Sequence, residues 1–305
     1  MTEKPPISQA VLLAAGFGTR LAPLSGILPK ALFPVLNRPM LGYWLKKCSE
    51  AGVRRVAVNC HHKAEQIKDY LARSEDEFPE LDIFLSYEPE ILGTGGGVKK
   101  AAQNFTGPLW VINCDIYADI DLQKISRDFL PRNIPAVMAV SDSARPTVSI
   151  DRAGRIVGLR EQKQVPNEVK RLFGLGIMAV SQTFRDLLPD GPSDIIEVLA
   201  RYLDQKPETR NLSEIFWSDM GTPQSYWALN RDLSRNSLIL ASGAVLDGEG
   251  TGFVVMGPGS RVFPGARVQD SVIWSNADIR PGAVVKNAVV TKSVPEDSEV
   301  EGVWV

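Results

Sequence analysis

Residues 11–40 read VLLAAGFGTRLAPLSGILPKALFPVLNRPM, and this stretch decides how the rest of the chain is interpreted. It opens with a short apolar run typical of a buried strand, and a glycine-rich turn follows at once. Such a turn points backbone amides at phosphate oxygens. A Walker A loop is excluded because the chain contains no Gly-Lys pair. A dinucleotide-binding turn is excluded because Leu21 stands where GxGxxG needs its third glycine.

Around this turn, short apolar runs alternate with amphipathic stretches. The pattern predicts strands over 10–15, 53–59, 81–87 and 109–113, and helices over 40–51, 64–71 and 97–104. This rhythm is typical of a Rossmann-like, mostly parallel α/β sheet with helices on both faces. The loops after 10–15 and 109–113 should then face one crevice. Further on we expect strands over 136–140 and 172–180, a hairpin near 151–154, and helices over 193–204 and 223–235.

The composition changes after Asn236, where helical periodicity ends. Aliphatic residues then recur at spacings of 6, 5, 6 and 6, at Val262, Val268, Ile273, Ile279 and Val285. A hexapeptide repeat predicts a short left-handed parallel β-helix with these side chains pointing inward, and the alternative is an irregular β tail. We therefore expect two domains, 1–236 and 237–305. Assembly of several copies through the β-helix is a further expectation.

The bulk composition excludes several classes of protein. A formal net charge of −2 over 305 residues provides no basic field for nucleic acid. Three scattered cysteines form no CxxC pair, and their odd number argues against a disulfide framework and for a reducing cytoplasm. No apolar stretch has the length of a signal or a membrane span. His61 and His62 lack further ligands at metal spacing, so we interpret them as loop or helix-cap residues.

Residues 16–40 resemble the signature of the sugar-phosphate nucleotidyltransferases, G-x-G-T-R-L-x-P-L followed by P-K-A-L-x-P-V-x-N-x-P-M. Three more segments resemble the family in its own order: EPEILGTGGGVKKA at 88–101, LWVINCDIYADI at 109–120 and FWSDMGTPQSYWAL at 216–229. The resemblance covers residues 10–230 and is strongest toward mannose-1-phosphate guanylyltransferase-like members. Many members also carry a C-terminal β-helix, which the repeat region matches.

The resemblance implies transfer of a nucleotidyl group from a nucleoside triphosphate to a sugar 1-phosphate, with loss of pyrophosphate. Two anions must meet, so the site should supply cations more than acid or base groups. Arg20 and Lys30 would be catalytic, and Asp115 and Asp219 would hold Mg²⁺. The nucleotide would be bound by the turn and by the second segment, at Leu13, Ala14, Ala15, Gly16, Gly18, Thr19, Glu88, Gly93 and Thr94.

On the sugar side the chain departs from the family. Many members carry E-K-P, whereas residues 158–166 read GLREQKQVP, so Glu161 aligns and Gln162 replaces the lysine. Either Lys163 supplies the charge from one position later, or another cation does, such as Arg160 or Lys170. The resemblance also implies sugar contacts from a later strand at the backbone of Gly174 and Gly176.

Glu88 bears on the choice of base, because uridylyltransferase relatives often have glutamine there. A carboxylate only accepts hydrogen bonds and so matches the two donors of guanine. This favours GTP, with mannose 1-phosphate or a similar hexose or heptose 1-phosphate. Two alternatives stay open. A main-chain group could read the base, and the enzyme could be a uridylyl- or thymidylyltransferase.

Two other functions compete with this interpretation. Acyltransferases built on hexapeptide β-helices use a histidine base there, and no histidine follows His62, so we reject that class. A regulatory homologue without catalysis should have lost the lysine or a metal aspartate. Lys30, Asp115 and Asp219 all persist, and only the altered E-K-P segment favours this alternative.

Overall fold

The computed structural model describes residues 7–130, 132–160 and 165–305, which divide by contacts into two compact units. The first unit combines the chain up to Gly16 with Leu41–Trp217, and the second combines Phe17–Met40 with Ser218–Val305. Each unit is discontinuous in sequence, and residue 236 belongs to the second. The domain boundary at 236 stays a prediction. We call residues 17–40 the signature loop.

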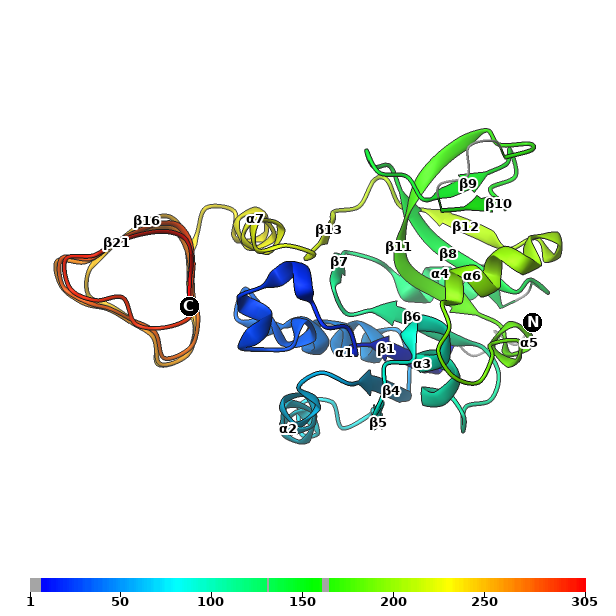
Figure 1. The fold of residues 1–305 in the computed structure, drawn as a ribbon, viewed down its shortest axis with the longest axis horizontal. Helices are drawn as coiled ribbons and strands as arrows, with labels where there is room; N and C mark the ends of the chain where they lie inside the picture. The colour runs from blue at the N-terminus through cyan, green and yellow to red at the C-terminus, as the bar shows by residue number, and fades with distance from the viewer. Residues whose placement is uncertain (1–6, 131, 161–164) are drawn as a thin grey trace. The chain divides into compact units, whose positions relative to one another are not determined.

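The first unit is built on a nine-stranded sheet that contains the order β10-β9-β11-β6-β1-β4-β5 (Figure 1). Four of its strands are parallel: β1 (Gln9–Leu13), β4 (Arg55–Cys60), β5 (Asp82–Tyr87) and β6 (Leu109–Asn113). Since β4 and β6 flank β1 on opposite sides, the direction of winding reverses there. Strands were predicted at all four places, and each is confirmed within a few residues.

The other half of the sheet runs largely antiparallel. Strand β11 (Lys170–Val180) pairs antiparallel with β6 and with β8 and β9, and β12 lies parallel to β8. The predicted hairpin is confirmed as the antiparallel pair β9 and β10. The bounds are β8 (Ala136–Ser141), β9 (Val148–Ile150), β10 (Ile156–Leu159) and β12 (Glu208–Asn211).

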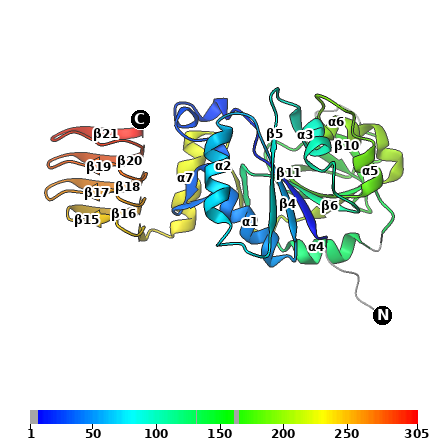
Figure 2. The same ribbon diagram turned by 90° about the horizontal axis from the view of Figure 1, so that it is seen from below.

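Helices cover both faces of this sheet. On one face α3 (Gly93–Ala101), α5 (Gln182–Asp186) and α6 (Ile195–Leu199) bury a common apolar core against Val11, Ala57 and Val111. Figure 2 shows α1 (Met40–Glu50) and α4 (Leu122–Phe129) on the opposite side of the strands from α3 and α6. The remaining helix, α2 (Ala64–Ser74), connects β4 to β5. Among helices of the described ranges, none has both the length and the apolarity to cross a bilayer.

The second unit contains the predicted left-handed β-helix, whose triangular coils are stacked (Figures 1 and 2). All strand pairs of the β-helix are parallel, in the orders β14-β16-β18-β20-β21 and β15-β17-β19. The five aliphatic residues of the repeat are at most 1% exposed and share one core, so their inward orientation is confirmed. The strands are β14 (Leu238–Leu240), β15 (Val245–Leu246), β16 (Glu249–Met256), β17 (Arg261–Val262), β18 (Arg267–Ile273), β19 (Asp278–Ile279), β20 (Val284–Val290) and β21 (Glu299–Trp304).

Within the second unit, the signature loop is fastened to α7 (Pro223–Ser234) and to the β-helix. The ring of Phe33 meets those of Tyr226 and Trp274 edge-on, with 5.3 Å between centroids in both pairs. The Tyr226 hydroxyl donates to the Pro34 carbonyl at 2.6 Å and accepts from the Trp274 indole N–H at 3.0 Å. A loop of turns and very short strands therefore obtains its rigidity from partners far away in sequence.

All three cysteines are buried, and burial raises the pKa of Cys48 to about 12, of Cys60 to about 11 and of Cys114 well above its ordinary value. Only the thiolate reacts with alkylating reagents, and a raised pKa keeps the thiol protonated at pH 8. Iodoacetamide at pH 8 should therefore leave the native protein unmodified, while the unfolded chain takes up three groups by mass spectrometry. Rapid alkylation of the native protein would contradict this burial.

Candidate active site

The glycine-rich turn leaves the sheet beside Asp115. Strands β1 and β6 are neighbours with Leu13 opposite Asn113, and the Cys114 N–H donates to the Leu13 carbonyl at 3.2 Å. Ala14 and the half-buried Asp115 therefore follow adjacent strands at their carboxyl ends, where the winding reverses. In α/β sheets this is the place where ligands bind.

The turn itself has the conformation that its glycines allow. Gly18 has a φ of +63°, a left-handed conformation that a side chain would strain. At Gly16 an added Cβ would meet no atom within 4 Å, so one side of the backbone is open. Thr19 and Arg20 follow, both exposed, in the 3₁₀ turn η1 (Thr19–Leu21), whose last residue is buried. The turn thus offers exposed backbone to a ligand.

Three predicted site residues come together in the second unit. The Lys30 ammonium lies 3.9 Å from the Asp219 carboxylate, and their side chains are 12% and 23% exposed. Gly221 lies between Asp219 and Arg20, because a Cβ built on it would be 3.0 Å from an Asp219 oxygen and 3.2 Å from the Arg20 Nη2. Two cations therefore lie near one partly exposed carboxylate, an arrangement suited to phosphate oxygens.

The segment that carries Asp219 also begins helix α7. Asp219 is the last residue of β13 (Trp217–Asp219), and α7 begins four residues later. Thr222 caps the helix through a reciprocal pair of hydrogen bonds with Ser225. Pro223 occupies the first turn, where its missing N–H costs nothing. The expected helix start is confirmed, and the cap holds the backbone three residues after Asp219 in one conformation.

Gly221 lies in the segment 216–229 but was not among the predicted site residues. Gly221→Ala should lower kcat/KM for pyrophosphate release by about ten- to a hundredfold, because the methyl would displace Asp219 and Arg20 by a fraction of an ångström. The same change at Gly26, where an added Cβ meets nothing within 4 Å, is the matched control and should keep full activity. Equal rates for both variants would show that the spacing of Arg20 and Asp219 does not matter.

Glu88 is fully buried in the first unit. One carboxylate oxygen accepts from the Asn59 side-chain amide at 2.8 Å, and the other accepts from the Leu92 N–H at 2.9 Å. Both oxygens are therefore engaged with the protein's own donors. This arrangement does not present the carboxylate to a base, which removes the support that Glu88 lent to GTP.

The glycine cluster of α3 is filled by the chain's own atoms. The position of a Cβ on Gly93 lies 2.6 Å from the Ser193 carbonyl oxygen, and that on Gly96 is occupied by the Gly191 carbonyl. Thr94 accepts a hydrogen bond from the Ile195 N–H at 2.9 Å. This packing explains why α3 begins four residues earlier than predicted, since tertiary contacts outweigh the low helix propensity of glycine.

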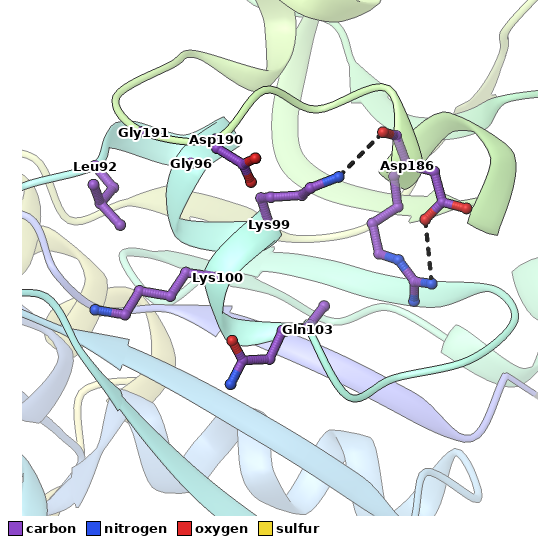
Figure 3. A pocket seen from close by; sticks show the side chains of 10 residues that line it. Leu92, Gly96, Lys99, Lys100, Gln103, Asp186, Asp190 and Gly191 are labelled. Carbon is purple, nitrogen blue, oxygen red and sulfur yellow. Dashed lines mark hydrogen bonds and ion pairs between the residues drawn. The ribbon is translucent and has the colours of Figure 1, made fainter.

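A cavity of about 420 Å³ lies beside the same helix, lined by residues from Leu92 to Gln103 and from Arg185 to Gly191. Figure 3 shows the Lys99 side chain pointing toward Asp186, whereas Lys100 points away from both. The Lys99 ammonium donates to the Asp186 carbonyl at 3.1 Å, and the Arg185 guanidinium lies 3.6 Å from the Asp186 carboxylate. Of the described residues that line this cavity, none is a predicted catalytic or metal-binding residue.

On the sugar side, Gly174 and Gly176 lie in β11. Gly176 has a φ of +66°, and a Cβ there would be 2.5 Å from the Asn113 amide, so this glycine makes room for Asn113. The Gly174 N–H donates to the Thr147 hydroxyl at 3.1 Å. Asn113, which precedes the predicted metal ligand Asp115 by two residues, is a polar neighbour of this strand that the sequence analysis did not single out.

The two alternative cations for the sugar phosphate are both committed to carboxylates. Arg160 pairs with Asp194 at 3.0 Å and with Glu197 at 2.9 Å. Lys170 pairs with Asp142 at 2.7 Å, and this hydrogen bond lowers the pKa of the Asp142 carboxyl. The predicted residues Glu161 and Lys163 lie outside the described part of the chain. Arg160 and Lys170 thus both face carboxylates in this structure, and the choice among the three cations stays a prediction.

Comparison with protein families gives two matches. Residues 9–236 match the family model described as nucleotidyl transferase, and residues 228–301 match the model of a GlmU-like C-terminal hexapeptide region. Together they cover both parts of the chain that the sequence analysis distinguished.

Similar curated proteins include two that are named for guanylyl transfer. D-glycero-α-D-manno-heptose 1-phosphate guanylyltransferase of Campylobacter jejuni is 26% identical, over 72% of this chain and 97% of that protein. Mannose-1-phosphate guanyltransferase of Debaryomyces hansenii is also 26% identical, over 92% of this chain and 85% of that protein. A UTP–glucose-1-phosphate uridylyltransferase of Synechocystis is 26% identical as well, over 92% of this chain and 82% of that protein.

Solved structures show the same fold. HddC from Yersinia pseudotuberculosis, complexed with GMP-PN, aligns with a TM-score of 0.60 and 21% identity over 74% of this chain and all of that one. A UDP-glucose pyrophosphorylase complexed with UDP-glucose aligns with a TM-score of 0.64 and 16% identity over 76% of this chain and all of that one.

Proposed function

The chain belongs to the nucleotidyl transferase family, and on this premise we propose that it joins a nucleoside triphosphate to a sugar 1-phosphate. An oxygen of the sugar phosphate attacks the α-phosphorus of the triphosphate, and the bond from that phosphorus to the oxygen bridging toward the β-phosphorus breaks. The products are a nucleoside diphosphate sugar and pyrophosphate. The observation that carries the proposal is the group of Arg20, Lys30 and Asp219, which the signature loop and the end of β13 bring together.

The chain's own residues serve this reaction through charge. Amides of residues 15–19 bind the triphosphate, and Arg20 pairs with the outer phosphates that leave as pyrophosphate. Lys30 neutralises charge near the reacting phosphorus, where negative charge grows in the transition state. A sugar phosphate is already mostly a dianion at pH 7, so its attack needs no base from the protein. A chain with only two histidines suits that requirement.

We assign Mg²⁺ to Asp115 and Asp219. Carboxylate oxygens are ligands that this hard cation prefers, and both side chains are only partly buried. Among the described residues no three His, Cys, Asp or Glu side chains gather into a cluster. The protein would thus supply few of the ligands, and oxygens of the substrates and of water would supply the others. Mg²⁺ sites in phosphate chemistry are usually built in this way. The ion would supply charge stabilisation for the phosphates.

For the base we propose GTP, and for the sugar a mannose or heptose 1-phosphate. The support is the pair of similar proteins named for guanylyl transfer, whose alignments cover most of the chain. UTP is the second candidate, because the uridylyltransferase relative has the same identity over 92% of the chain.

The three free cysteines, all buried, fit the reducing cytoplasm that we propose as the location of the protein. Assembly through the β-helix stays a prediction.

A substrate panel tests this function. Purified protein with Mg²⁺ is given GTP, UTP, dTTP, ATP or CTP together with each of several hexose and heptose 1-phosphates, and pyrophosphate is measured. We expect one pair to exceed the others clearly, with no release when the sugar phosphate or Mg²⁺ is omitted. Absence of pyrophosphate from every pair, with a folded protein, would favour the regulatory homologue instead.

A further inference from the structure

We propose that Glu88 and Asn59 form a buried bridge that holds the glycine-rich turn and the start of α3 in the positions that bind the nucleotide. In this role Glu88 is a positioning residue that does not read the base. The inference rests on the proposed function, because it assigns both ends of the bridge to the nucleotide site. It differs from the expectation drawn from the family, in which this position contacts the base.

Asn59 forms the first half of the bridge. Its side-chain oxygen accepts from the Ala14 N–H at 2.7 Å, and its side-chain amide donates to Glu88 at 2.8 Å. Ala14 is the first residue after β1, and Asn59 is near the end of the neighbouring strand β4. The two bonds use opposite ends of one amide, so they fix both its orientation and the direction in which the turn leaves the sheet.

Glu88 forms the second half. Its other oxygen accepts from the N–H of Leu92, the residue that caps α3, at 2.9 Å. The Glu88 backbone is held as well, since its N–H donates to the Cys60 carbonyl at 2.8 Å and its carbonyl lies 2.8 Å from the His61 Nδ1. Three hydrogen bonds in series thus connect the turn to the first residues of α3.

The chemistry of the two partners explains why a carboxylate stands at this position. Both groups that face Glu88 are N–H donors, so only a side chain with two accepting oxygens satisfies both. A Cβ on Gly97 would be 2.8 Å from the Glu88 oxygen and 2.7 Å from the Asn59 amide, so this glycine makes room for the pair. Burying a carboxylate is costly unless it is fully hydrogen-bonded, and a packing role alone would be served by a neutral residue.

The bridge can be tested by exchanging the two chemical groups. In Glu88→Gln one amide N–H meets another donor, and in Asn59→Asp two carboxylates face each other. In the double variant every bond is restored. The carboxylate introduced at position 59 would accept from the Ala14 N–H and from the amide introduced at position 88, whose oxygen would accept from the Leu92 N–H. Glu90→Gln, at an exposed acid of the same segment, is the matched control.

Binding of triphosphates with Mg²⁺ is measured by calorimetry across the five bases, with KM for the sugar 1-phosphate where the variant turns over. We expect each single variant to weaken triphosphate binding about tenfold or more, since one buried partner is left unsatisfied. The double variant should recover to near the wild-type value with the order of bases unchanged, and KM for the sugar phosphate should stay constant. A variant that only loses its fold would lose triphosphate binding and turnover of the sugar phosphate together, so it would not give this difference.

Two results would overturn the proposal: single variants that bind like the wild type, or a changed order of bases that persists in the double variant, which would make Glu88 a base-reading residue. Failure of the proposed function is separate from both. It would show as triphosphate binding without pyrophosphate release in the wild type, and the binding series would still decide the role of the bridge. A wild type that binds no triphosphate would refute both.

Discussion

Lys30→Ala should reduce the rate of pyrophosphate release by about a hundred- to a thousandfold, the loss typical of removing one group that stabilises charge in a transition state. The Lys30 side chain is nearly buried, at 12% exposed, and its ammonium lies 3.9 Å from Asp219. Alanine removes the positive charge and leaves the Asp219 carboxylate facing incoming phosphates. Both changes raise the barrier for a reaction between anions.

The fold should survive this change. Lys30 lies in a short 3₁₀ turn, η3 (Lys30–Leu32), and alanine suits that backbone. Thermal unfolding of Lys30→Ala should therefore stay close to that of the wild type. Lys68→Ala, at an exposed lysine of α2 that pairs with Glu65, is the control and should keep full turnover. Pyrophosphate release by pure Lys30→Ala at the wild-type rate would refute the assignment.

Trp274→Ala should destabilise the second unit by about 3–5 kcal/mol, the usual cost of truncating a large buried aromatic side chain. Trp274 is 5% exposed, its ring meets Phe33 of the signature loop edge-on, and its indole N–H donates to Tyr226. Its loss opens a cavity at the place where the β-helix fastens that loop. Because the loop carries Lys30, activity should fall as well, at temperatures where the protein is still folded.

Trp304→Ala is the matched control, since Trp304 belongs to the same β-helix but lies in its last strand, β21. Its ring is only partly buried, and its indole N–H donates to the Ser293 carbonyl at 3.3 Å. This variant should lower the unfolding temperature less and keep its activity. Equal activity losses in both variants would mean that the β-helix acts through general stability alone, not through the signature loop.

Periodic features of the fold could be predicted from the sequence because they depend on local patterns. The inward residues of the β-helix repeat every five or six positions. A strand of one coil pairs with the corresponding strand of the next coil, so inward residues lie beside inward residues. The apolar runs of β1 and β6 likewise identify buried parallel strands. Helix α3 was placed too late, because glycine lowers helix propensity and its packing against Ser193 is a long-range contact.

The candidate site was only partly predictable for the same reason. Resemblance to the family's motifs identified Arg20, Lys30 and Asp219, and the structure brings them together. The burial of Glu88 depends on Asn59, which is 29 residues away and belongs to no quoted motif. The support of the signature loop by Tyr226 and Trp274 spans about 190 to 240 residues of sequence and left no local signal.

The central claim is that the α-phosphorus of a nucleoside triphosphate is transferred to a sugar 1-phosphate. It is tested most directly with the best substrate pair from the panel, labelled with ³²P at the α or the γ position in parallel reactions with Mg²⁺. We predict that α-label appears in a sugar nucleotide resistant to phosphatase and that γ-label appears in pyrophosphate, in equal amounts. Release of γ-label as inorganic phosphate, or its transfer to the sugar phosphate, would contradict the claim.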